Sequence, residues 1–218
     1  MQYLKRRIRR LKVVSRALAA CLSIAVLVPL SITLHKFLST KNNYKTVTNE
    51  SLGTAPVRRS AWAMQSVTWP TYMYFAIAVI SLVFNATIMT SYLHSVKAAN
   101  KAATVDSFFT SGVLLLNLVV WTMSTSLYKH ESTVTNDKGI HNDLWGWTCS
   151  PAAQILQPVF DDQLNFKTFC NIQAASFCIG LVQVGAIILT IVIYIFATRR
   201  LQSKKAVRRS MTTQKPRK

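Results

Sequence analysis

The sequence predicts an all-α membrane protein, a four-helix transmembrane bundle with cytoplasmic N- and C-termini. Three observations predict it: four long apolar runs, basic residues gathered at both ends of the chain, and a polar loop before the last apolar run that holds two cysteines. The uncharged runs are Ala17–Leu34, Pro70–Leu93, Ser107–Leu127 and Asn171–Thr198. A helix needs about 20 such residues to cross about 30 Å of hydrocarbon. Apolar runs of this length indicate membrane spans rather than buried helices of a soluble protein.

The formal net charge is +19, and its distribution favours a membrane rather than a nucleic acid as the partner. Sixteen of the 26 Lys and Arg residues lie in the segments 1–16 and 199–218, which contain no acid. Because basic flanks stay on the cytoplasmic side, both tails are expected there, and the number of spans is even. Anionic lipids are the expected partners of these tails. The predicted lipid contacts are Arg6, Arg7, Arg9, Arg10, Arg199, Arg200, Lys204 and Lys205.

The chain is thus divided into a basic tail at 1–16, a membrane domain at 17–198 and a basic tail at 199–218, which is expected to be disordered. The spans are expected at about 17–37, 70–93, 107–127 and 171–198, with outer loops at 39–69 and 129–170.

The first outer loop is polar and is expected to be irregular, since it contains Gly53, Pro56 and few apolar residues. It includes the sequence Asn49-Glu50-Ser51, an N-glycosylation sequon on the non-cytoplasmic side in this topology. Asn49 is therefore a candidate glycosylation site.

Three amides lie inside the predicted spans. Asn85 and Asn117 are expected at about the same depth in neighbouring antiparallel helices, and Gln183 lies near the middle of the last span. Amides in these positions are expected to form hydrogen bonds between helices, each contributing about 0.6 kcal/mol. An alternative is a polar path for a solute, although ion-coupled carriers usually need an ionisable residue inside a span.

Small residues in the last span predict close helix packing. Ser176 and Gly180 are four residues apart, and Gly185 follows. This spacing of small side chains lets two helix backbones approach closely, within the bundle or between two copies of the chain.

The cysteines differ in their positions. Cys149 and Cys170 lie in or at the end of the second outer loop, where oxidising conditions allow a disulfide. Closing that loop would contribute about 3 kcal/mol. Cys21 and Cys178 lie within spans and are expected to be buried as small apolar residues. The cysteines lack the spacing of a zinc site, and the acidic residues of the second outer loop lack the spacing of a calcium-binding loop. No metal or cofactor is therefore predicted.

One stretch carries a resemblance to a known family. Trp145, Trp147 and Cys149 form W-x-W-x-C, and the last span begins with Phe166, Cys170, Gln173 and Ala175 in F-x-x-x-C-x-x-Q-x-A. With four spans and cytoplasmic tails, the chain resembles the MARVEL-type tetraspan membrane proteins, especially the fungal ones. It departs from them in its long basic tails and in Phe177, where a tryptophan is expected. Claudin-like tetraspans are the nearest alternative, but they carry their cysteine pair in the first outer loop.

The resemblance implies a non-catalytic protein that organises membrane domains or takes part in membrane trafficking. Its expected location is the plasma membrane or the endomembrane system, and its expected partners are the lipid bilayer and other copies or other membrane proteins. No catalytic motif is present, so no catalytic residue is predicted. Two alternatives stay open: a small-solute transporter or channel, and a membrane-embedded enzyme built around His141 and Asp143.

Overall fold

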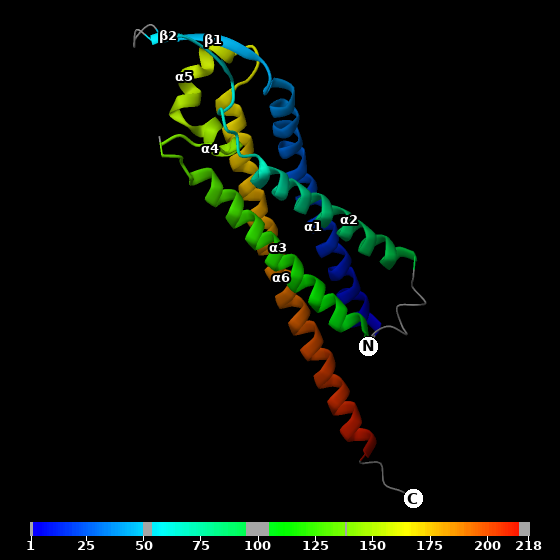
Figure 1. Cartoon of the computed structure of the whole chain (residues 1–218). Coiled ribbons are helices and arrows are strands. Elements are labelled where there is room, and N and C mark those ends of the chain that lie inside the picture. The colour runs from blue at the N-terminus through cyan, green and yellow to red at the C-terminus, as the bar shows by residue number, and fades with distance from the viewer. Residues whose placement is uncertain (1, 50–53, 95–104, 138, 214–218) are drawn as a thin grey trace, which may run out of the picture.

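A computed structural model shows four long helices running together, with a small folded unit at one end (Figure 1). It describes residues 2–49, 54–94, 105–137 and 139–213. The long helices are α1 (Gln2–Thr40), α2 (Trp69–His94), α3 (Val105–Thr133) and α6 (Phe166–Thr213). The small unit contains β1 (Tyr44–Asn49), β2 (Thr54–Ser60), α4 (Leu144–Cys149) and α5 (Pro151–Phe160). We call these four short elements and the residues that link them the cap.

Each long helix contains a stretch that is long and apolar enough to cross a membrane. The stretches are Val13–Thr40, Trp69–Thr90, Ser111–Thr133 and Phe166–Phe196. This confirms the prediction of four such helices in a multi-pass membrane protein. At the cap side the third and fourth helices extend beyond the predicted spans, through exposed polar residues such as Lys129 and His130 in α3 and Lys167 in α6.

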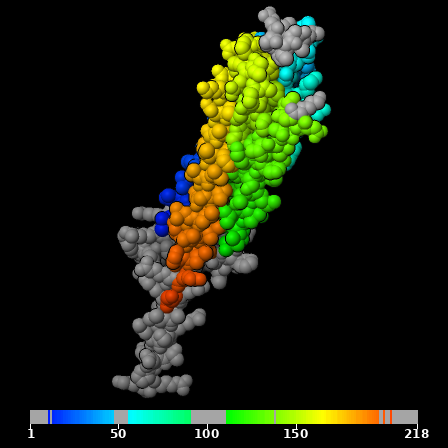
Figure 2. Space-filling model, turned by 90° about the vertical axis from the view of Figure 1, so that its left-hand side faces the viewer, coloured from blue at the N-terminus to red at the C-terminus, as the bar shows by residue number. Residues whose placement is uncertain are grey.

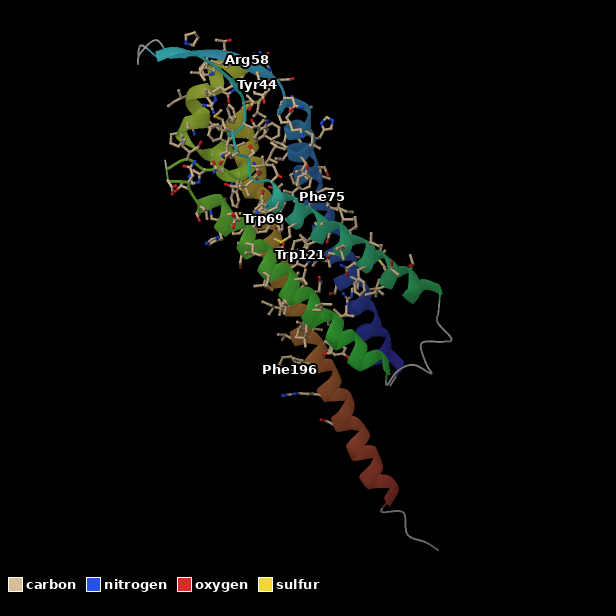
Figure 3. All side chains as sticks on the ribbon, viewed as in Figure 1. Tyr44, Arg58, Trp69, Phe75, Trp121 and Phe196 are labelled. Carbon is tan, nitrogen blue, oxygen red and sulfur yellow. A yellow bond between two sulfur atoms is a disulfide. The ribbon has the colours of Figure 1, made fainter. Side chains whose placement is uncertain are left out.

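Many large apolar side chains of the four stretches face outward, although others such as Leu30 and Ile187 are buried. Ile80, Leu116 and Phe196 have exposed fractions of 67%, 66% and 69%, and Figure 3 shows Phe196 projecting away from α6. The buried residues of the same helices include Ser23, Ser81, Asn85, Ser124, Ser176 and Gln183. Water would disfavour such an apolar surface, whereas lipid hydrocarbon solvates it, so this arrangement fits a bundle surrounded by lipid.

The core-facing residues of α6 form one regular seam. Phe166, Phe169, Gln173, Ser176, Gly180, Gln183 and Ile187 are all buried. Their spacing alternates between three and four residues, which keeps one stripe of a helix against its neighbours in left-handed packing. Figure 2 shows α3 and α6 side by side along one face, with the cap above them. The seam continues from the cap into the membrane bundle.

The segment 39–69 is not irregular as predicted. It contains an antiparallel hairpin in which Tyr44 lies opposite Ser60 and Val47 lies opposite Val57. The strands are rich in β-branched threonine and valine, which favour extended backbone. An all-α description is therefore incomplete.

Contact with α5 helps to explain why this hairpin forms, since two strands alone are only marginally stable in water. Lys45 of β1 donates hydrogen bonds to the carbonyl oxygen of Val159 at 3.0 Å and to the carboxylate of Asp162. Its ammonium also lies 5.8 Å from the ring centroid of Phe160.

The C-terminal basic segment is helical as far as Thr213, so the prediction of disorder was wrong from Arg199 to that residue. The sequence here is rich in Lys and Arg, which are good helix formers. Extending a helix that the span has already formed avoids the cost of nucleation. Figure 1 shows the beginning of α1 and the end of α6 at the end of the bundle opposite the cap.

Candidate functional site: the seat of the cap on the bundle

The cap is joined to α6 by a disulfide between Cys149, the last residue of α4, and Cys170. The two Cα atoms are 5.0 Å apart, and the predicted pair is confirmed. The bond closes the loop that contains α5. We call this disulfide, together with Trp145, Trp147 and Gln173, the seat of the cap.

Gln173 connects three helices at the seat and is fully buried. Its Nε2 donates to the hydroxyl of Thr148 at 3.0 Å and to the carbonyl oxygen of Leu144 at 3.3 Å, both in α4. Its Oε1 accepts from the Tyr128 hydroxyl of α3 at 3.2 Å. A buried amide needs such partners, because leaving one unpaired costs about 1–3 kcal/mol. Gln173 therefore fixes the position of α4 over α3 and α6.

Trp147 holds the hairpin side of the cap. Its indole Nε1 donates to the carbonyl oxygen of Ala61 at 2.9 Å, and its side chain packs in an apolar core with Phe166 and Trp62. Trp62 in turn donates to the Thr40 hydroxyl at 2.8 Å, at the end of α1. The tryptophan and phenylalanine of the sequence motif thus join the cap to two of the long helices.

Trp145 continues an aromatic column that rises from the bundle, and sequence reasoning missed the rest of this column. Its ring stacks on Tyr128 at 5.1 Å, Tyr128 stacks on Tyr74 at 4.6 Å, and Tyr74 meets Trp121 edge to face at 5.9 Å. Phe177 lies 5.4 Å from Trp145. Trp121 and Tyr128 are one heptad apart on the same helix, which is the spacing of residues on one packed face. That spacing could have identified them.

Asp143 begins α4 as its N-cap. Its carboxylate accepts hydrogen bonds from the backbone N–H groups of Trp145 and Gly146 at about 3.0 Å. Burial raises the pKa of Asp143 from 3.8 to about 6, while these hydrogen bonds and the nearby His141 act in the opposite direction. His141 and Asp143, around which an enzyme site was considered, are therefore close together, but Asp143 is buried and its carboxylate serves as a helix cap.

Asn85 is buried and links α2 to α1. Its Nδ2 donates to the carbonyl oxygen of Ser81 at 2.8 Å, and its Oδ1 accepts from Arg16 Nη1 at 3.2 Å. The hydroxyl of Ser81 accepts from Ser23 and from the indole of Trp121, each at 3.2 Å. This cluster joins α1, α2 and α3 inside the bundle.

The other two amides do not join that cluster. Asn117 is half-buried in a groove between α2 and α3, and its side chain makes no hydrogen bond with any described residue. The expected bond between Asn85 and Asn117 is not formed, because Asn85 turns toward Arg16 of α1. Gln183 is fully buried, and neither polar atom of its amide has a hydrogen-bond partner within the described part of the chain.

The small residues of α6 have two different environments. Ser176 and Gly180 are buried against α2, where the Ser176 carbonyl accepts from the Tyr74 hydroxyl at 3.2 Å. A Cβ on Gly180 would collide with that hydroxyl. Gly185 is exposed, and a Cβ there would meet nothing within 4 Å. Ser176 and Gly180 thus lie on the buried seam of α6, whereas Gly185 faces outward because it lies off that seam.

The remaining predicted positions lie at the two ends of the molecule. Cys21 and Cys178 are exposed free thiols on the bundle surface, not buried as expected, because each lies outside its helix's core-facing stripe. Asn49 ends β1, but Glu50 and Ser51 of its sequon are outside the described residues. Arg199 is exposed on α6. The other predicted lipid contacts lie on helical backbone with side chains outside the described part: Arg6, Arg7, Arg9, Arg10, Arg200, Lys204 and Lys205.

Comparison with known proteins places the chain in a family whose function is not described. A family model described as "Domain of unknown function (DUF8762)" matches residues 2–217, so the chain belongs to that family. No curated protein matches the chain, and no solved structure matches it.

Proposed function

We propose that this member of the DUF8762 family is a non-catalytic integral membrane protein that organises membrane domains or takes part in membrane trafficking. The observation that carries the proposal is the extension of α1 and α6 beyond the apolar stretches. From Phe196 to Thr213, α6 continues for about 25 Å as a helix with six Lys or Arg residues. The basic part of α1 lies at the same end of the bundle.

Two basic helices at one membrane face would attract anionic lipid. Each basic residue close to such a surface contributes about 1 kcal/mol, so together they would concentrate anionic headgroups beneath the bundle. This proposal assigns that face to the cytoplasm, in line with the positive-inside rule. The polar groups of the seat and of the Asn85 cluster are engaged in holding helices together, which suits a scaffold.

The test is lipid clustering around the full chain in proteoliposomes. Self-quenching of a fluorescent anionic lipid should increase when the chain is present and fall with added salt. The variant with Gln at Arg199, Arg200, Lys204 and Lys205 should lose much of this quenching. The matched control is Lys167→Gln, which removes an exposed charge at the cap end. Equal quenching by the parent, the tail variant and the control would refute the proposal.

We extend the proposal to a MARVEL-type architecture. Its support is that four residues of the resembling motif, Trp145, Trp147, Phe166 and Gln173, are all buried close to the disulfide. Residues that share one structural task are expected to lie together. An experimental structure in which Trp145 and Gln173 lie apart would remove this support.

One observation favours a second candidate function, transport of a small polar solute. The amide of Gln183 is buried within an apolar stretch and has no hydrogen-bond partner among the described residues. A polar guest could supply that partner. Flux through proteoliposomes that is lost on Gln183→Leu or Asn117→Leu would favour transport. Flux that stays at the level of empty liposomes in the parent would exclude this candidate.

A further inference from the structure

A pocket of about 270 Å³ lies where the end of α1 meets the hairpin. Three of its lining residues are cationic: Lys41, which follows α1, and Arg58 and Arg59 of β2. Tyr44 and Trp62 contribute aromatic walls. Figure 3 shows Tyr44 and Arg58 near each other at the cap end of the molecule. None of the acidic residues that the structure describes lines this pocket.

The aromatic side chains position both guanidinium groups. The Arg58 guanidinium carbon lies 5.7 Å from the ring centroid of Tyr44, and that of Arg59 lies 5.4 Å from the ring centroid of Trp147. Such cation–π contacts orient a cation without neutralising it. Within the described part of the chain, none of the three cations forms an ion pair. The described residues therefore leave the positive charge of the pocket uncompensated.

Arg59 shows the consequence most clearly. Its side chain is half-buried, and its Nε atom is buried with no hydrogen-bond partner among the described residues. Removal from water lowers the pKa of Arg59. A buried charge is normally paired and hydrogen-bonded, because its desolvation is otherwise costly. An anion in the pocket would provide the opposite charge that Arg59 lacks among the described residues.

We propose that this pocket binds a phosphate group through Arg58, Arg59 and Lys41. Arginine presents a planar fork of donors that matches two phosphate oxygens, and lysine adds a point charge. The volume suits a small ligand or one headgroup, being close to the lower end of ligand pockets at about 300 Å³. Lys41 directly follows the apolar stretch that ends at Thr40. A phosphate could therefore come from the adjacent lipid surface or from a soluble compound.

The experiment has two arms, both on the full chain. In detergent, calorimetry measures binding of glycerol 3-phosphate, with glycerol as the uncharged comparison. In nanodiscs that contain a phospholipid, native mass spectrometry after detergent release measures the phospholipid that is retained. A signal in the first arm identifies a soluble phosphate as ligand, and a signal in the second arm alone identifies a lipid headgroup.

The variants are Arg59→Gln, Arg58→Gln and Lys41→Gln, with Lys167→Gln as the matched control outside the pocket. Loss of one charge-assisted contact should weaken binding about tenfold, whereas the control should bind as the parent does. Arg58 is exposed at the rim, so its variant tests the pocket even if Arg59→Gln disturbs Trp147. Absence of binding in both arms, or equal binding by Arg58→Gln and Lys167→Gln, would overturn the proposal.

Discussion

The core of the cap is built from Trp62, Trp147, Phe160 and Phe166, whereas the interior of the bundle combines apolar residues such as Leu30 and Trp121 with polar residues such as Asn85 and Gln183. The surfaces of the two regions show the opposite contrast, because the bundle surface is apolar and the cap surface carries charged groups. Around the bundle, aliphatic side chains such as Ile80 and Leu116 face outward, while the cap exposes charged groups such as Lys41, Arg58 and Asp162.

This contrast indicates which interactions stabilise each region. Burial of apolar area stabilises the cap, because its surroundings are aqueous. Between helices in lipid there is little hydrophobic gain, so close approach of small residues and hydrogen bonds between side chains hold the bundle together. Gln173 and the disulfide lie where the two kinds of core meet.

Removal of the disulfide should have the largest effect. Cys149→Ser with Cys170→Ser releases a loop whose ends are 21 residues apart, and the cap should lose about 3 kcal/mol of stability. Thermal unfolding in detergent, followed by tryptophan fluorescence, measures this loss. Cys21→Ser with Cys178→Ser is the matched control, because both thiols are free and exposed. A loss of similar size in the control would contradict the account.

Asp143 should make the stability of the cap depend on pH. Its pKa is raised from 3.8 to about 6 in the folded protein, so the folded state holds the proton more tightly than the unfolded chain. The contribution of this group is therefore full below about pH 4 and is lost as the pH rises to about 6, a change on the order of 2 kcal/mol. Unfolding measured across this range in the parent and in Asp143→Asn isolates the effect, since asparagine is an equally good N-cap. Parallel pH profiles would contradict it.

Two glycines of α6 should respond in opposite directions to alanine. Gly180→Ala places a Cβ against the Tyr74 hydroxyl and should destabilise the bundle by about 2 kcal/mol through overpacking. Gly185→Ala meets open space and should stabilise the helix by about 0.5–1 kcal/mol. Unfolding in a detergent titration measures both. Equal effects at the two positions would show that α6 packs on a different face.

Two glutamines should also differ when each is replaced by leucine. Gln173→Leu leaves the Tyr128 hydroxyl without its acceptor and removes the hydrogen bonds that the Gln173 amide donates to Thr148 and Leu144, so it should cost about 1–2 kcal/mol. Gln183→Leu removes no hydrogen bond to a described residue, so stability should stay unchanged or rise. Unfolding in a detergent titration compares the stability of the two variants. A larger loss for Gln183→Leu would indicate that its amide has an internal partner.

The sequence was sufficient for the features that depend on local composition. Runs without charge identified four long apolar helices, since length and hydropathy alone decide whether a helix can cross a bilayer. Two cysteines in one outer loop identified the disulfide. Trp145, Trp147 and Gln173 were singled out by their motif, but only the coordinates show that Gln173 reaches Thr148 and Tyr128.

Features that depend on tertiary contacts were missed or misplaced. The hairpin forms where Lys45 meets α5, a contact between segments far apart in the chain. The partner of Asn85 is Arg16 rather than Asn117, because depth in the membrane does not determine which way a side chain turns. The cationic pocket unites Lys41 with Arg58 and Arg59 only through the hairpin. Such juxtapositions are set by packing, which single-sequence patterns do not contain.

The most direct test of the account is thiol labelling in sealed vesicles with a membrane-impermeant reagent. In a four-span topology, the cap and the exposed Ser203 of α6 lie on opposite sides of the membrane. In a chain with Ser at positions 21 and 178, Cys149 and Cys170 should react from one side only and only after reduction. Ser203→Cys in the same background should react only from the other side, with or without reductant. Labelling of all three from the same side would contradict the four-span topology, and labelling of Cys149 and Cys170 without reductant would contradict the disulfide.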